Sequence, residues 1–391
     1  MNGEYFIKNI VNHDETLKNR VIYIRDGKIS DIRKGSPPGT EKSYCYAIPG
    51  FIDMHTNGGG GKDIMDNSID TLDSISRFYL QNGTTSFLAS TITASLPQID
   101  SVLITASEFA SINKKQADKG IHATFLGIHL EGPWLSMKNL GAHNPDHNKV
   151  PDKESLELIS KHQDIIKMVT FSYHSPESEK LLKLLVNKGI IPACGHDDSY
   201  DERILSGFRK GIKVVTHIYC VSSTVHKRNG KRYMGITEMG LMTDGVTVEV
   251  IADGMHTTKY FWDFITHSKQ YKDIIIVSDS IRCTGLVASP GTKYKLGDTN
   301  VIIDQGVAWL EDRSVYAGSI ATMYSSFERI VKQWNVKMND AVRITSYNQA
   351  ALLNLSDRLG GIGPGKVADI LLLDQDLNLQ RVIKSGSEVV I

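Results

Sequence analysis

The chain has 391 residues, and its 44 basic side chains equal its 44 acidic ones, so no net charge favours nucleic acid or an anionic membrane as a partner. Hydrophobic residues make up 41% of the chain and charged residues 23%, as in soluble globular proteins. No apolar stretch is long enough to cross a bilayer. The four cysteines show no CxxC spacing, and Met1–Lys8 lacks the order of a signal peptide. We therefore expect a cytoplasmic protein with reduced thiols.

The chain begins and ends with β patterns, and its middle alternates between strands and helices. Residues 1–48 and 345–391 contain short β-like runs with turn signals, although a last helix is expected near 339–355. Between them, helical periodicity covers 71–81, 101–117, 177–188 and 259–269. A (β/α)8 barrel needs roughly 250 residues. The sequence predicts a TIM-type barrel over 49–344 and a small β-sandwich domain built from 1–48 and 345–391.

Eight apolar runs of the middle region end at or near a polar residue. They cover residues 49–55, 86–90, 124–131, 168–174, 190–196, 214–217, 246–253 and 274–279. A parallel strand buried on both faces has such an apolar pattern, and functional groups gather at the carboxyl ends of barrel strands. Imidazoles and carboxylates from several strand ends are thus expected to meet at one point.

Five of these polar residues predict a metal-dependent hydrolase. His55, Glu131, His196, His217 and Asp279 end five different candidate strands. Two imidazoles and one carboxylate are a common catalytic zinc set, so Glu131, His196 and His217 are the preferred ligands of one divalent metal, with Zn²⁺ expected. Asp279 is placed to take a proton from water and to return it to a leaving amine.

Three other features have a less specific interpretation. His129 and His174 also lie on candidate strands, and we interpret them as hydrogen-bonded structural residues. The run Gly58–Asp63 lacks the first glycine and the Ser/Thr of a phosphate-binding P-loop, which favours a flexible loop beside the site. The basic cluster 226–232 fits a solvated loop or an anion-binding loop equally well.

Several longer motifs together resemble one known family. They are Pro49-Gly50-Phe51-Ile52-Asp53-x-His55, His129-Leu130-Glu131-Gly132-Pro133-Trp134, Gly141-Ala142-His143, Gly195-His196, Thr216-His217, Ala252-Asp253-Gly254-x-His256 and Ser278-Asp279. With these motifs, nearly the whole chain resembles the N-acetylglucosamine-6-phosphate deacetylases of the amidohydrolase superfamily. The resemblance implies hydrolysis of an N-acetylated amino sugar to acetate and the free amino sugar.

The resemblance also implies roles for residues of the site. Glu131, His196 and His217 match the family's metal ligands, and Asp279 matches its catalytic acid/base. His143 matches a residue that contacts the sugar and orients the amide. Arg228 and His256 match residues that hold the 6-phosphate, and an arginine of this kind can reach the neighbouring subunit's site. A homodimer is therefore implied.

Two departures from the family leave alternatives open. The pair His55-x-Asn57 is a mixture of the types seen with one and with two metals, so we favour one ion and keep a second site at His55 and Asn57 as an alternative. Cys220 and Val221, followed by Ser222-Ser223, replace a segment whose backbone cradles the phosphate. The substrate is accordingly N-acetylglucosamine, its 6-phosphate or a related N-acetyl sugar.

Two further functions compete with deacetylation. A dihydroorotase- or hydantoinase-type amidohydrolase usually needs a lysine on the fourth strand, and residues 168–174 contain none. A non-catalytic sugar-binding relative would be expected to lack a ligand or the acid/base, whereas all four core residues are present. Another amidohydrolase acting on a small amide remains the alternative.

Overall fold

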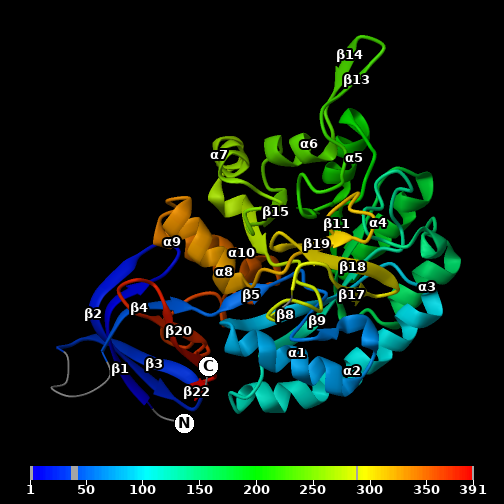
Figure 1. Ribbon diagram of the computed structural model, residues 1–391. Coiled ribbons are helices and arrows are strands. Elements are labelled where there is room, and N and C mark those ends of the chain that lie inside the picture. Colours follow the sequence, from blue (N-terminus) through cyan, green and yellow to red (C-terminus); the bar gives the residue numbers. More distant parts are fainter. Residues whose placement is uncertain (1–2, 37–42, 288, 390–391) are drawn as a thin grey trace.

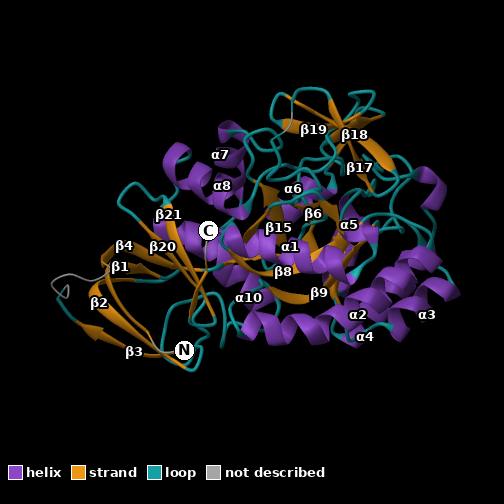
Figure 2. Ribbon diagram, turned by 60° about the horizontal axis from the view of Figure 1, so that its bottom comes forward, coloured by secondary structure: helices purple, strands orange, loops and turns teal. Residues whose placement is uncertain are grey.

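The computed structural model describes residues 3–36, 43–287 and 289–389. Its largest part is a barrel, with a smaller β domain on one side that contains both chain ends (Figure 1). Helices surround the barrel on its outside (Figure 2). The predicted fold class is therefore confirmed.

Eight parallel strands form the barrel, in the sheet order β16-β15-β12-β11-β10-β9-β8-β5. Their bounds are β5 Phe51–Asp53, β8 Thr84–Thr91, β9 Thr124–Glu131, β10 Ile166–Phe171, β11 Ile191–Cys194, β12 Val214–Val215, β15 Thr247–Ile251 and β16 Ile274–Val277. A parallel bridge between Thr56 and Ser280 brings the first and last strands together. All eight apolar runs of the sequence thus became barrel strands, buried on both faces as their composition predicted.

The helices follow the strands in the alternation that the sequence predicted. They are α1 Ile69–Gln81, α2 Leu96–Asp118, α3 Lys153–Lys161, α4 Pro176–Lys188, α5 Asp201–Lys210, α6 Ile236–Met242, α7 Lys259–Ser268, α8 Met323–Glu328, α9 Met338–Val342 and α10 Asn348–Leu352. Short 3₁₀ turns are η1 Ile64–Asp66, η2 Pro145–His147 and η3 Tyr271–Asp273, and π-helical turns are η4 Arg329–Gln333 and η5 Arg343–Tyr347. Ser95 and Ser175 cap α2 and α4, each with a proline in the first turn, which explains where these two helices begin.

The small domain is a seven-stranded sheet made by both ends of the chain. Its order is β22-β21-β20-β4-β1-β2-β3. The bounds are β1 Gly3–Val11, β2 Thr16–Arg25, β3 Lys28–Lys34, β4 Ser43–Pro49, β20 Ile370–Leu373, β21 Leu379–Lys384 and β22 Ser387–Val389. Ile7, Ile22 and Ile370 belong to a core of its own, separate from that of the barrel.

The exact domain boundaries near residues 48 and 344 stay a prediction. Residues of α10 lie against the barrel, since Asn348 Nδ2 donates to the carbonyl of Ile274 at 2.7 Å.

Among the described residues, no helix combines the length and the apolar composition that a membrane span requires.

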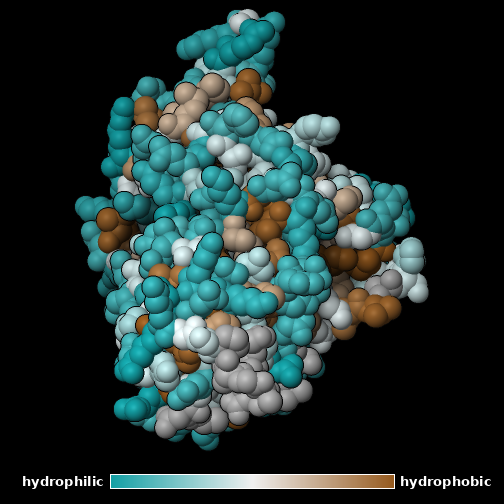
Figure 3. Space-filling model, turned by 90° about the vertical axis from the view of Figure 1, so that its left-hand side faces the viewer, coloured by the Kyte–Doolittle hydropathy of each residue, from teal (hydrophilic) through white to brown (hydrophobic). Residues whose placement is uncertain are grey.

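Three smaller sheets of the described chain are formed by segments that connect the barrel's strands and helices. They are the pair β6 Gly58–Gly59 and β7 Lys62–Asp63, the hairpin β13 His226–Arg228 and β14 Lys231–Tyr233, and the three-stranded sheet β17 Thr292–Leu296, β18 Thr299–Asp304 and β19 Val307–Leu310. The hairpin projects from the body in Figure 1 and forms the hydrophilic projection at the top of Figure 3. Thr299 Oγ1 in β18 donates to the carbonyl of Ala142, which ties the three-stranded sheet to the loop before His143.

Candidate metal centre and active site

The predicted metal ligands converge at the carboxyl ends of the barrel strands. Glu131 is the last residue of β9, His196 follows β11 by two residues, and His217 follows β12 by two. Glu131 Oε1 lies 2.9 Å from His217 Nε2 and 3.3 Å from His196 Nε2. The two Nε2 atoms are 3.2 Å apart. Three donor atoms from three strands thus surround one point.

These separations fit the tetrahedral coordination of a metal ion. Ligands that bind zinc at roughly 2.0–2.1 Å are about 3.3 Å from one another in a tetrahedral arrangement. His196 Nδ1 lies 2.8 Å from the carbonyl oxygen of Asn139 and donates to it, which leaves the Nε2 lone pair free for a metal. All three side chains are buried, so the described residues form a fitting site for one divalent cation.

The backbone at these strand ends is strained. The φ angles of His196, His217 and Asp279 are 49°, 22° and 48°, in the left-handed region that non-glycine residues seldom adopt. Such conformations persist only where the surrounding structure enforces them, and they cluster at functional sites. The turn after each of these strands directs a functional side chain toward the centre of the barrel mouth.

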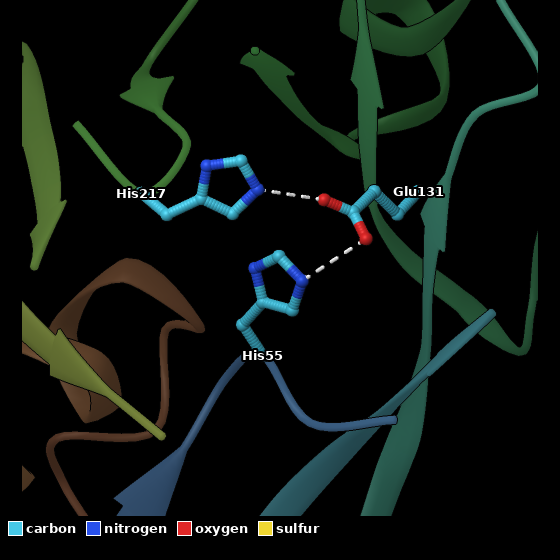
Figure 4. A group of neighbouring side chains, drawn as sticks. All are labelled: His55, Glu131 and His217. Atoms are coloured by element: carbon cyan, nitrogen blue, oxygen red, sulfur yellow. Dashed lines mark hydrogen bonds and ion pairs between the residues drawn. The ribbon is translucent and has the colours of Figure 1, made fainter. Parts of the chain in front are cut away.

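His55 lies beside the second carboxylate oxygen of Glu131. Its Nε2 is 3.3 Å from Glu131 Oε2 and 3.5 Å from Asp279 Oδ1, and Figure 4 shows His55 and His217 each facing one oxygen of the Glu131 carboxylate. His55, Glu131 and His217 therefore form a second candidate cation group. Asn57 is used differently, because its Nδ2 donates to Asp279 Oδ1 at 2.8 Å.

A buried carboxylate that the sequence analysis missed supports two of these histidines. Glu249 Oε2 in β15 accepts from His55 Nδ1 at 3.1 Å and from the backbone N–H of His217 at 3.2 Å. Glu249 is fully buried, and its Oε1 has no partner among the described residues. The only signal in the sequence was one acidic residue inside an otherwise apolar strand. Glu249 sets the tautomer of His55 and directs its Nε2 into the site.

Asp279 is placed as a proton carrier. It follows β16 by two residues, and its backbone N–H donates to the carbonyl of His55 at 2.9 Å. Burial is the main influence on its carboxyl group and raises its pKa, although the charges of His55 and His217 act in the opposite direction. A carboxyl group with a raised pKa exchanges protons more readily near neutral pH.

His143 is placed as a neutral hydrogen-bond donor. The backbone N–H of Thr93 donates to His143 Nδ1 at 3.2 Å, so the ring proton is on Nε2, which lies 3.6 Å from Glu131 Oε2. Burial, together with the charge of His196, lowers the pKa of His143 to about 3. The imidazole is therefore uncharged and presents its Nε2–H toward the metal centre.

The cavity above the cluster is lined on its outer side by Cys220, Val221 and His256, together with Tyr316. His256 Nδ1 lies 2.7 Å from Asp253 Oδ2. Burial alone would lower the pKa of His256, but the hydrogen bond and charge of Asp253 raise it to about 9. His256 is thus an imidazolium at neutral pH, and no lysine or arginine of the described chain lines this cavity.

Arg228 is the predicted site residue that the structure does not bring to the site of its own chain. It lies on the projecting hairpin, where residues 226–232 are exposed. His129 and His174 have the structural surroundings that we expected. His129 lies between Ser90 Oγ and Thr170 Oγ1, at 3.0 and 2.8 Å, and His174 Nδ1 lies 2.8 Å from Ser172 Oγ.

The comparison with known proteins agrees with this geometry. The sequence model of the Amidohydrolase family matches residues 46–389. The chain belongs to this family. It is 33% identical over 388 residues to the N-acetylglucosamine-6-phosphate deacetylase of Bacillus subtilis, covering 97% of this chain and 94% of that protein.

Solved structures of similar proteins cover the whole fold. The N-acetylglucosamine-6-phosphate deacetylase of Thermotoga maritima is 30% identical, with a TM-score of 0.87 and 99% coverage of both chains. The Mycobacterium smegmatis enzyme, a mutant in complex with N-acetyl-D-glucosamine-6-phosphate, is 26% identical, with a TM-score of 0.88 and 100% coverage of both chains. The resemblance inferred from the sequence motifs is therefore confirmed.

Proposed function

We propose that this protein removes the acetyl group from an N-acetylated amino sugar by hydrolysis, with N-acetylglucosamine 6-phosphate as its substrate. The observation that carries the proposal is the convergence of Glu131, His196 and His217 beside the buried Asp279. The products are acetate and the free amino sugar.

The residues of the chain divide the work of amide hydrolysis. A divalent cation held by Glu131, His196 and His217, with Zn²⁺ as our proposal, would polarise the acetamido carbonyl and lower the pKa of a water molecule. Asp279 accepts the proton of the attacking water and then donates it to the departing amine. His143 donates its Nε2–H to the carbonyl oxygen as negative charge develops there.

The phosphate requires cations, and the chain offers them in two places. His256 supplies one positive charge at the outer wall of the cavity. Arg228 supplies a second if its hairpin reaches the site of a partner subunit, and its projection from the body supports this arrangement (Figure 1). We therefore propose a homodimer with the hairpin exchanged, acting in the cytoplasm, where its four free cysteines stay reduced.

A second candidate substrate is the unphosphorylated sugar. Cys220 and Val221 give the outer wall an apolar character, and among the described residues of the same chain His256 is the positively charged side chain of this wall. Burying a phosphate against such a wall costs free energy unless a positively charged side chain of a partner subunit also contacts it. The identity of the substrate thus depends on the hairpin.

The first experiment compares acetate release from N-acetylglucosamine and from its 6-phosphate, with the zinc content measured on the same sample. Faster turnover of the phosphate supports the proposal, and faster turnover of the free sugar supports the second candidate. Asp279→Asn should lower kcat by about 10³-fold while zinc stays bound. Acetate release from neither sugar by the zinc-loaded protein would refute the proposed function.

A mixing experiment tests the exchange of the hairpin. Arg228→Ala and Asp279→Asn are each expected to turn over the phosphate poorly. If the hairpin is exchanged, a hybrid dimer contains one site with an intact Asp279 and Arg228 of the partner subunit, so co-refolding the two variants restores activity. No recovery in a dimer of confirmed hybrid composition would place Arg228 outside the neighbouring site.

A further inference from the structure

A second cavity continues outward from the candidate active site. It has a volume of about 280 Å³ and shares Cys220, Val221, His256 and Tyr316 with the cavity over the metal ligands. Its outer half is formed by other residues, namely Tyr219, Trp309, Ser314 and Val315. The volume is close to the lower end of the roughly 300–1,000 Å³ that is typical of small-molecule pockets. It suits one additional ring and not a polymer chain.

Two aromatic rings dominate the outer half of this cavity. Trp309 lies in β19, and Tyr316 follows the next turn. The two residues pair through an antiparallel backbone bridge. The two ring centroids are 4.4 Å apart at an angle of 64°. Tyr316 also packs on His256, at a centroid distance of 4.9 Å. A single short hairpin therefore fixes an aromatic wall directly against the imidazolium of the active site.

The polar atoms of this wall are available to a ligand. Among the described residues, neither Trp309 Nε1 nor Tyr316 OH has a hydrogen-bond partner, although both rings are half-buried. Ser314, beside them, is exposed. Tryptophan and tyrosine present an apolar face together with a polar group, a combination that suits a ligand with an apolar face and hydroxyl edges. A pyranose ring has this chemistry.

We propose that Trp309 and Tyr316 form a second sugar subsite, which binds a pyranose ring linked to the N-acetylated sugar in the active site. This proposal rests on the proposed function and defines its substrate class more closely: a disaccharide with an N-acetylated unit is a substrate. Four shared residues connect the two cavities, so the second ring lies next to the first.

The test compares N-acetylglucosamine with its β-1,4-linked dimer. Both compounds carry at C6 the group, a hydroxyl or a phosphate, that the wild-type enzyme prefers in its substrate. Trp309→Ala should lower kcat/KM for the dimer about tenfold, which corresponds to roughly 1.4 kcal/mol, and change that for the monomer less than twofold. Trp309→Phe should retain most of the activity on the dimer. Tyr260→Ala, whose ring is 86% exposed on α7 and outside the cavity, is the matched control and should change neither.

Binding can be measured independently of turnover. The chain has four tryptophans, and Trp134, Trp262 and Trp334 are buried at 1%, 1% and 6% exposure. Trp309 is therefore the main target of acrylamide quenching. The deacetylated dimer, which is a product and is not consumed, should reduce this quenching in the wild type and leave it unchanged in Trp309→Phe.

Two results would overturn the subsite. Equal losses on monomer and dimer in Trp309→Ala would show that the wall contacts the first sugar. Unchanged quenching with the deacetylated dimer would show that no second ring binds there. Failure of the proposed function is distinguishable, because then the zinc-loaded wild type releases acetate from neither sugar, whatever the quenching shows.

Discussion

Removal of Glu249 should weaken the metal centre although this residue is not a proposed ligand. Its Oε2 accepts from His55 Nδ1 and from the backbone N–H of His217, and the side chain is fully buried. Outer residues of this kind typically contribute 10- to 100-fold to metal affinity. Glu249→Leu removes both hydrogen bonds and leaves two buried donors unpaired, so we expect a 10- to 100-fold loss of zinc affinity.

Glu249→Gln separates geometry from charge. Because one oxygen makes both hydrogen bonds and Oε1 is unpaired, the amide oxygen can keep both contacts while the NH₂ group is left without a partner. A buried unsatisfied donor costs roughly 1–3 kcal/mol. Stability should fall by that amount, with a loss of zinc affinity smaller than in Glu249→Leu.

The assay is competition for zinc with a chromogenic chelator, combined with urea unfolding of the zinc-loaded protein. Glu108→Gln, on the exposed face of α2, is the control for loss of one negative charge. Wild-type zinc affinity in a folded Glu249→Leu variant would refute the reasoning, since it would mean that neither hydrogen bond helps to position a ligand.

Four more outcomes follow from the site. His143→Gln should lower kcat by about 10²- to 10³-fold with little change in zinc content, as expected on loss of an oxyanion donor; equal losses of zinc and activity would instead assign a structural role. His256, whose pKa is raised to about 9, is charged below that value, so KM for the 6-phosphate should rise as pH increases through about 9 while KM for the free sugar stays flat. The stabilisation from its pairing with Asp253 is likewise complete below pH ~6.5 and is lost as pH rises through about 9, which unfolding of His256→Gln across this range can check. The wild type should bind one zinc ion per chain and Asn57→His two, by elemental analysis after dialysis; two ions in the wild type would overturn our preference for one.

The sequence predicted the parts of the site that lie at strand ends. Glu131, His196 and His217 follow apolar runs, so the rule that barrel strands share a functional end was enough to bring them together. His143 lies in a loop and was found only through the family motif. The hydrogen bond that His143 accepts from the backbone N–H of Thr93 could not be predicted, because a backbone donor does not depend on the type of residue.

Other parts depended on tertiary structure that no local pattern contains. Glu249 belongs to an apolar run, and only the barrel's closure shows that its carboxylate meets His55 and the backbone of His217. The sheet β17–β19, with Trp309, comes between the last barrel strand and α8 and shows no barrel periodicity. The orientation of the hairpin that carries Arg228 is set by its attachment to the barrel and not by its composition.

The seven-stranded sheet has a consequence for how the chain is made. β4 pairs with β1 on one side and with β20 on the other, and residues Ser43–Pro49 and Ile370–Leu373 are separated by almost the whole barrel. During synthesis, one edge of β4 therefore stays open until Ile370–Leu373 emerge. Open strand edges pair readily with other chains. A ribosome paused before residue 370 holds a complete set of barrel strands beside an unfinished sheet, and pairing with β20 then covers the open edge of β4.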